Sequence, residues 1–188
     1  MKKDLKGIDM KIGLLVGSLR KNSWNKKLAK EVAELLDVET YPIDLSEMPF
    51  YNQDLDGASP HEEYQRLRED IKECDGFIFI TPEYNRSLAP VLKNAIDIGS
   101  RGPEGNLWTG KPATVFSSTI GTMGGVSSNL ALKQSFNCVN LISPSNPEVY
   151  LAKINELFDK DGKLIEATRP FIKSSCDDFV EFAKKFID

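Results

Sequence analysis

Several features that would indicate a membrane protein or a metal site are missing from this 188-residue sequence. No apolar run approaches the roughly 20 residues that a membrane-spanning helix requires. The single histidine, His61, cannot build a His-rich metal site, so no metal centre is expected. His61 would also have to serve any Ser–His–acid triad, but its polar surroundings, "GASPHEEY", favour a surface position, and no nucleophile elbow lies nearby.

Cysteine is scarce, and an export signal is absent. Cys74, Cys138 and Cys176 are far apart and form no CxxC pair. An odd number of cysteines without an export signal indicates reduced thiols, for which core or boundary positions are expected. The stretch "MKKDLKGIDM" carries lysines but no apolar segment, so it is not a secretory signal. We therefore expect a cytoplasmic protein in which residues 1–9 form an extension before a strand that opens at Met10.

A strongly basic surface is missing as well. The 24 Lys and Arg residues against 28 Asp and Glu residues give a net charge of −4, and no basic block occurs. This balance argues against nucleic acid or a membrane as the partner. Two common nucleotide-binding patterns, GxGxxG and GxxxxGKS/T, are absent, which excludes a Rossmann fingerprint and a P-loop.

The sequence does contain a regular alternation of strand and helix patterns. Strands are predicted at 11–17, 38–43, 76–80, 112–118 and 139–144. Helices are predicted at 25–36, 62–74, 89–99, 124–136 and 168–187. The alternation indicates one α/β domain, residues 1–188, with a five-stranded doubly wound parallel sheet and helices on both faces. The irregular stretch 44–61 is long for a compact domain, and such loops are usually functional or mobile.

In such sheets ligands bind beyond the carboxyl ends of the strands, where three unusual loops are predicted. The first, "GSLRKNSWN" (17–25), precedes a helix and offers the side chains of Ser18, Arg20, Ser23 and Asn25. Hydroxyls, a guanidinium and free N–H groups at a helix start suit a terminal phosphate. The alternative is that Ser23 or Asn25 simply caps the helix, but capping requires neither Ser18 nor Arg20.

The other two loops follow consecutive buried strands. In "TPEYNRS" (81–87), Tyr84 offers a ring face and Asn85 an amide, so a flat heteroaromatic ring could lie there. The glycines of "SSTIGTMGG" (117–125) let a backbone approach a ligand closely. Each loop by itself could equally be an ordinary turn. Together the three loops offer a phosphate site at one end and a planar-ring site at the other, which describes flavin mononucleotide (FMN).

The stretches "GSLRKNSWN" and "TPEYNRSLAPVLKNAIDIGSR" together resemble the NADPH-dependent FMN reductase family, which includes quinone and chromate reductases. The similarity spans about residues 10 to 150 and implies a flavodoxin-like fold with strand order 2-1-3-4-5. It implies noncovalent FMN and NADPH or NADH as co-substrate. Hydride would pass from NAD(P)H to FMN and then to a quinone, free flavin, chromate or a similar small-molecule acceptor, in a ping-pong sequence. That chemistry belongs to the flavin, so no catalytic side chain is assigned.

The resemblance also implies which residues bind the cofactor. The phosphate would be held by Ser18, Arg20, Ser23 and Asn25. The isoalloxazine ring would lie between Pro82, Glu83, Tyr84 and Asn85 on one side and Ser117, Ser118, Gly121 and Gly124 on the other. Family members are commonly dimers or tetramers, so a homodimer or homotetramer is expected. Relatives often carry Arg at the place of Ser127, which leaves open any nicotinamide or subunit contact of that arginine.

Two other classes of protein remain as alternatives. A flavodoxin-type electron carrier would serve a protein partner, but its phosphate loop has no prominent Arg and its surface is strongly acidic. A flavin-free hydrolase would be colourless and unable to take up FMN. The sequence leaves the physiological acceptor open. It also leaves open the choice between NADH and NADPH, because no residue is clearly placed to bind the 2′-phosphate that distinguishes NADPH.

Overall fold

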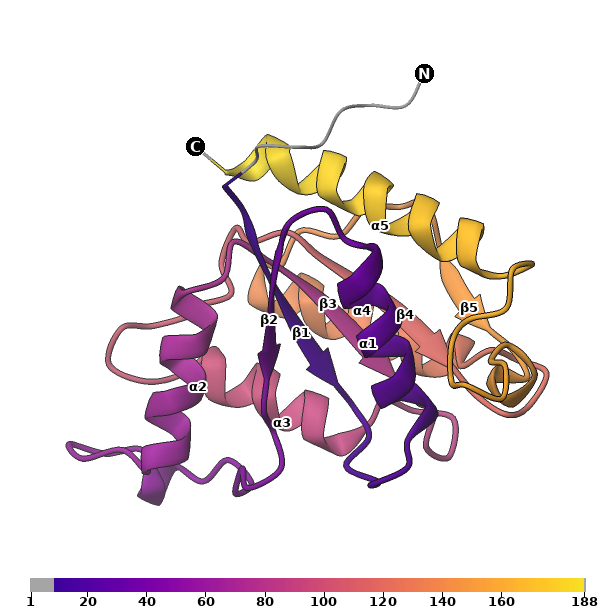
Figure 1. The fold of residues 1–188 in the computed structure, drawn as a ribbon. Helices are drawn as coiled ribbons and strands as arrows, with labels where there is room; N and C mark the ends of the chain where they lie inside the picture. The colour runs from indigo at the N-terminus through magenta and orange to yellow at the C-terminus, as the bar shows by residue number, and fades with distance from the viewer. Residues whose placement is uncertain (1–8, 188) are drawn as a thin grey trace.

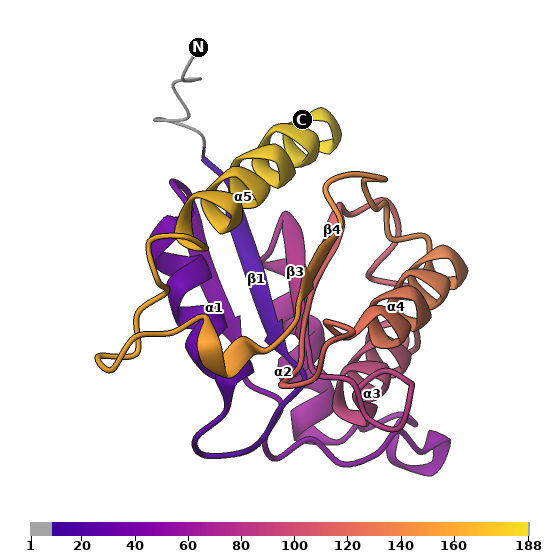
Figure 2. The ribbon, with the colours of Figure 1, turned by 90° about the vertical axis from the view of Figure 1, so that its right-hand side faces the viewer.

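The computed structural model describes residues 9–187, which contain a five-stranded parallel sheet with helices on both faces (Figure 1 and Figure 2). The strands are β1 (Lys11–Val16), β2 (Glu39–Ile43), β3 (Gly76–Thr81), β4 (Ala113–Ser118) and β5 (Val149–Leu151). The α-helices are α1 (Trp24–Leu35), α2 (Glu62–Lys72), α3 (Pro90–Gly99), α4 (Val126–Val139) and α5 (Arg169–Ala183). The strand order is β2-β1-β3-β4-β5, which confirms the predicted flavodoxin-like topology.

Each face of the sheet packs into its own hydrophobic core. β3 and β4 are buried along their whole length, as expected for strands covered on both faces. The helices α1 and α5 cover one face, with Leu28 and Phe179 in the core. The helices α2, α3 and α4 cover the other, with Tyr64, Leu92 and Phe136. Figure 2 shows these two helical layers on either side of the strands.

The fifth strand lies later in the sequence than its pattern predicted. We expected a strand at 139–144, but the chain there leaves α4 and contributes a single bridge at Ile142. Pro144 and Pro147 follow, and proline has no N–H to donate to a ladder. The paired segment is therefore Val149–Leu151, alongside the end of β4. The prediction of a strand at 139–144 was wrong for this reason.

The other predicted strands and helices are present, and their ends differ from the prediction by at most four residues, at the end of α5. The long irregular stretch 44–61 contains one 3₁₀ turn, Gln53–Leu55. The C-terminal pattern forms α5 followed by a second such turn, Lys184–Phe186. Across the described residues, every helix is too short or too polar to cross a lipid bilayer.

All strands are parallel, so their carboxyl ends meet at one edge of the sheet (Figure 2). In the observed register Val16 is paired with Ile80, and Thr81 is paired with Ser117. The loops after β1, β3 and β4 therefore start side by side. Gly17 allows this approach, because a Cβ at that position would lie only 2.8 Å from the Ala89 Cβ.

Candidate functional site

Ser18 and Arg20, in the loop between β1 and α1, have side chains that are free to bind a ligand. Ser18 is buried and Arg20 is exposed. Within residues 9–187, neither the Ser18 hydroxyl nor the Arg20 guanidinium has a hydrogen-bond or ion-pair partner. Ser23 is the N-cap of α1, and its hydroxyl accepts from the Lys26 N–H at 3.3 Å. No acidic side chain occupies the first turn of α1. The Ser18 hydroxyl, the Arg20 guanidinium and the N–H groups at the start of α1 are therefore donors that fit a phosphate dianion.

Asn25, also predicted for the phosphate, bonds to the end of β4. Its Oδ1 accepts from the Ser118 hydroxyl at 3.1 Å, and both side chains are buried. The hydroxyl of Ser117, also buried, donates to the carbonyl oxygen of Gly124 at 2.8 Å. These contacts tie the start of α1 and the loop after β4 to the edge of the sheet.

The loop after β3 is a tight two-residue turn. The N–H of Tyr84 donates to the Ser87 oxygen at 3.1 Å, and the reverse bond measures 3.0 Å. Asn85 and Arg86 between them have φ values of 50° and 65°, the pattern of a type I′ turn. Such a conformation is strained for arginine, and strain of this kind often accompanies a functional loop. The turn leaves Tyr84 41% exposed beside Pro82, which is half-buried.

Glu83 connects this turn to the start of α4. Its Oε2 accepts from the Ser127 N–H at 2.9 Å and from the Ser128 N–H at 3.4 Å. The other carboxylate oxygen pairs with the Arg86 guanidinium at 3.7 Å. A second link joins the hydroxyls of Thr81 and Ser128, 2.8 Å apart. Because a carboxylate is favourable at a helix N-terminus, Glu83 acts as a clamp between the loops after β3 and β4.

The glycines of the third loop have different roles. Gly124 has a φ of 60°, and a Cβ there would lie 2.9 Å from the Tyr150 backbone, so a larger residue would not fit. Gly121 is exposed, and a Cβ there would meet only the Thr119 hydroxyl, at 3.8 Å. Beside it, Ile120 is 71% exposed. The loop is therefore closely packed at Gly124 and open to solvent at Ile120 and Gly121.

An apolar pocket of about 410 Å³ lies next to the first two loops. Its lining includes Leu19, Arg20, Met48, Phe50, Tyr84 and Val91. Met48, Phe50 and Val91 were not predicted from the sequence. The only signal for the first two was the unusual length of the stretch 44–61. A larger cavity of about 800 Å³ lies between residues 144–150 and α5, and none of the predicted site residues lines it.

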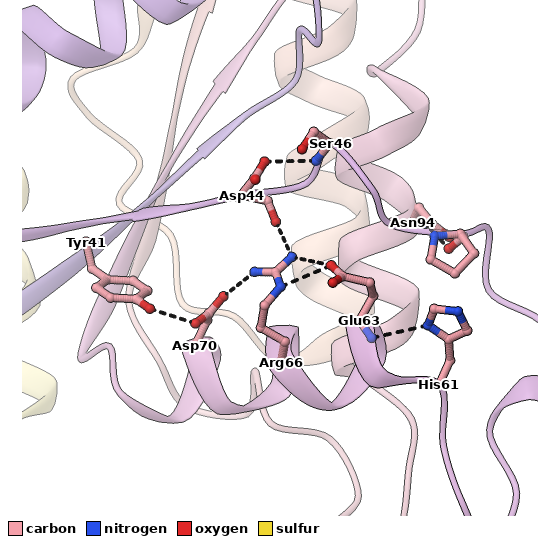
Figure 3. A network of polar contacts seen from close by, with 9 residues as sticks. Tyr41, Asp44, Ser46, His61, Glu63, Arg66, Asp70 and Asn94 are labelled. Atoms are coloured by element: carbon pink, nitrogen blue, oxygen red, sulfur yellow. Dashed lines mark hydrogen bonds and ion pairs between the residues drawn. The ribbon is translucent and has the colours of Figure 1, made fainter.

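His61 and the cysteines lie outside these loops. His61 is half-buried and caps α2, since its Nδ1 accepts from the Glu63 N–H at 3.2 Å (Figure 3). Burial raises the thiol pKa of Cys74 and of Cys176 to about 12. Cys138 is exposed on α4, so the expected core or boundary position was wrong for this residue.

The strand order defines a flavodoxin-like protein, and hydrogen bonds connect its three loops at the carboxyl edge of the sheet. The model of a family described as NADPH-dependent FMN reductase matches residues 10–156. The chain belongs to this family. It is an FMN-dependent oxidoreductase that uses NAD(P)H.

Similar proteins agree with this assignment. The chain is 39% identical over 175 residues to a quinone reductase of Pseudomonas putida, covering 92% of this chain and 94% of that relative. It is 32% identical over 178 residues to a 2-hydroxy-1,4-benzoquinone reductase of Burkholderia sp, with coverages of 93% and 97%. A solved flavoenzyme NAD(P)H:(acceptor) oxidoreductase from Paracoccus denitrificans has a TM-score of 0.88 and 36% identity, over 94% of this chain and 98% of that one. These findings support the reductase and not the flavodoxin-type carrier or the flavin-free hydrolase.

Proposed function

We propose that this reductase passes electrons from NAD(P)H to a quinone at the edge formed by the loops 17–25, 82–87 and 117–125. The observation that carries the proposal is the convergence of these loops, with Ser18 and Arg20 unpaired within residues 9–187. Bound FMN supplies the hydride-accepting and electron-passing chemistry. Two relatives are named for quinone reduction, which supports a quinone as the acceptor.

The site residues divide into three groups. We assign binding of the phosphate to Ser18 and Arg20 together with the N-terminus of α1, which Ser23 caps. We assign the two borders of the ring to the turn after β3 and the glycine loop after β4. The residues of these borders are Pro82, Tyr84, Asn85, Gly121 and Gly124. The remaining predicted residues hold the loops in position through the contacts described above, and they are Asn25, Glu83, Ser117 and Ser118.

The phosphate assignment is tested by titrating the FMN-free protein with FMN. Arg20→Ala should weaken FMN binding by on the order of 1.5–3 kcal/mol, the range for a hydrogen bond to a charged group. That loss corresponds to roughly a 10- to 150-fold higher Kd. Lys21→Ala is the matched control, because Lys21 is an exposed cation of the same loop. Riboflavin, which lacks the phosphate, should bind the parent protein much more weakly than FMN. Equal FMN affinity in Arg20→Ala and the parent would contradict the assignment.

The acceptor is tested in two half-reactions. The FMN-loaded protein is reduced anaerobically with NADPH and, separately, with NADH, while flavin absorbance is followed. A quinone is then added to the reduced protein. Rapid recovery of the oxidised spectrum supports quinone reduction, whereas a reduced flavin that no quinone reoxidises would rule it out. The two reduction rates decide the preferred nicotinamide.

We also propose that the protein is a homodimer or homotetramer. Ile120, Met123 and Leu130 are 71%, 52% and 53% exposed, on the loop after β4 and on α4. Large apolar side chains this exposed on one loop and the helix that follows it support a surface covered by a partner. Light scattering at micromolar concentration should give a multiple of the monomer mass, and a strictly monomeric mass at full FMN occupancy would contradict the proposal.

A cytoplasmic location is a separate proposal. It is supported by three cysteines that are all free thiols in the described residues. Cell fractionation should recover the protein with cytoplasmic markers, and its recovery in an exported fraction would overturn this location.

A further inference from the structure

The apolar pocket beside the candidate FMN loops is built by a segment with no assigned role. Residues 44–52 follow β2 and contribute Leu45, Met48 and Phe50 to the lining. Leu19 from the first loop and Val91 from α3 also line the pocket. Arg20 is the only charged residue of the lining. At about 410 Å³, the pocket falls within the range of small-molecule sites, roughly 300–1,000 Å³.

Figure 3 shows how α2 holds the start of this segment. The Arg66 guanidinium donates to the carbonyl oxygen of Asp44 at 2.6 Å. The same guanidinium donates to the carboxylates of Glu63, at 2.7 Å, and Asp70, at 2.8 Å. Asp70 also accepts from the Tyr41 hydroxyl of β2, at 2.8 Å. The exit from β2 is therefore fixed to α2 by a connected polar network.

The middle of the segment is fixed even more closely, around Phe50. Asn94 of α3 is buried, donates to the Pro49 oxygen at 2.8 Å and accepts from the Tyr51 N–H at 2.7 Å. The Tyr64 hydroxyl donates to the Phe50 oxygen at 2.6 Å. The Phe50 side chain is nevertheless 75% exposed. An aromatic ring presented on a fixed backbone is a preorganised contact surface, because little further entropy is lost on binding.

We propose that this pocket binds the apolar alkyl or prenyl chain of a quinone acceptor and thereby selects among quinones. The inference rests on the proposed function. Arg20 and Tyr84 belong both to the pocket and to the candidate FMN loops. A quinone whose hydrocarbon chain lies in the pocket would therefore have its quinone ring close to those loops. The aliphatic and aromatic lining matches a hydrocarbon chain and offers a polar ligand little to bind.

The experiment compares two benzoquinones that differ only in one substituent, a decyl chain or a methyl group. Phe50→Ala should raise KM for the decyl quinone about tenfold, which corresponds to about 1.4 kcal/mol, and change KM for the methyl quinone less than about twofold. Phe171→Ala is the matched control, since Phe171 is a 45% exposed phenylalanine on α5 outside the pocket lining. It should leave both KM values unchanged.

A second variant changes a lining residue on a different element, α3. Val91→Phe adds bulk from α3 and should also reduce the preference for the decyl quinone, while the Kd for FMN stays that of the parent. Calorimetry of the FMN-loaded protein with the decyl quinone, without NAD(P)H, gives a readout that does not depend on turnover. It should show the same loss of affinity in both variants.

The possible failures are distinguishable. A parent enzyme that binds FMN but reduces neither quinone would overturn the proposed function itself. Intact quinone turnover with the same decyl preference in the parent and both variants would overturn only the chain-binding pocket. Light scattering compares the mass of each variant with that of the parent. A changed oligomeric mass in a variant that keeps the parent's preference for the decyl quinone would show that a second copy of the chain covers the pocket instead.

Discussion

Removal of the Glu83 carboxylate tests the clamp between the loops after β3 and β4. Glu83→Ala leaves the N–H groups of Ser127 and Ser128 without their acceptor at the start of α4. Loss of a helix cap lowers the free energy of unfolding by about 0.5–2 kcal/mol. The Glu83 side chain is only 11% exposed, so the upper half of that range, about 1–2 kcal/mol, applies. For a chain of this size each kcal/mol lowers Tm by about 2–4 °C, so a decrease of about 2–8 °C is expected.

The substitution Glu83→Gln separates the charge from the hydrogen bonds. Glutamine keeps an acceptor oxygen of similar reach but loses the interaction of the charge with the helix dipole, about 0.3–1 kcal/mol. Its Tm should therefore lie between those of the parent and Glu83→Ala. Thermal unfolding is followed by circular dichroism on the FMN-free protein at neutral pH and low salt. Glu166→Ala is the control, because Glu166 is exposed and has no side-chain partner within residues 9–187.

Two results would refute this reasoning or refine it. A Tm for Glu83→Ala equal to that of Glu166→Ala would show that the clamp contributes nothing to stability. A Glu83→Gln protein as unstable as Glu83→Ala would assign the stabilisation to the charge instead of the hydrogen bonds. Adding FMN raises Tm by mass action, and if the clamp positions the cofactor loops, this increase should be smaller in Glu83→Ala at the same FMN concentration.

The remaining predictions concern turnover and thiol reactivity. Tyr84→Ala should impair turnover more than FMN retention, because the phosphate loop is untouched; loss of FMN with unchanged turnover per flavin would identify a cofactor clamp instead. We predict that one open flavin face serves both substrates in turn. Varying NAD(P)H at several quinone concentrations should then give parallel double-reciprocal lines, and intersecting lines would mean that both substrates are bound together. Only Cys138 should react rapidly with a thiol reagent without denaturant, because burial raises the pKa of Cys74 and Cys176 to about 12. Equally fast labelling of all three thiols would contradict this.

Features that depend on neighbouring residues could be predicted from the sequence. The apolar run 76–80 is stable only where both faces are covered, so it indicates a central strand of a parallel sheet. The stretches 17–25 and 82–85 combine polar side chains with turn residues, and the resemblance they carry identified the family and its cofactor. The strand prediction at 139–144 failed because an apolar stretch shows only that a segment can be a strand, and the prolines after it moved the pairing to Val149–Leu151.

Contacts between distant residues were decided only by the tertiary structure. Asn25 bonds to Ser118, 93 residues away, and Glu83 bonds to Ser127, 44 residues away. Asn25, Glu83 and Ser118 were predicted only as cofactor residues, and none of these contacts was predicted from the sequence. Phe50 was not identified at all, because its exposed position depends on hydrogen bonds from two separate helices. A side-chain hydrogen bond forms only when donor and acceptor lie about 3 Å apart in a suitable orientation. The packing of whole helices and strands sets that distance, so local sequence determined which groups are available and the assembled fold determined which of them meet.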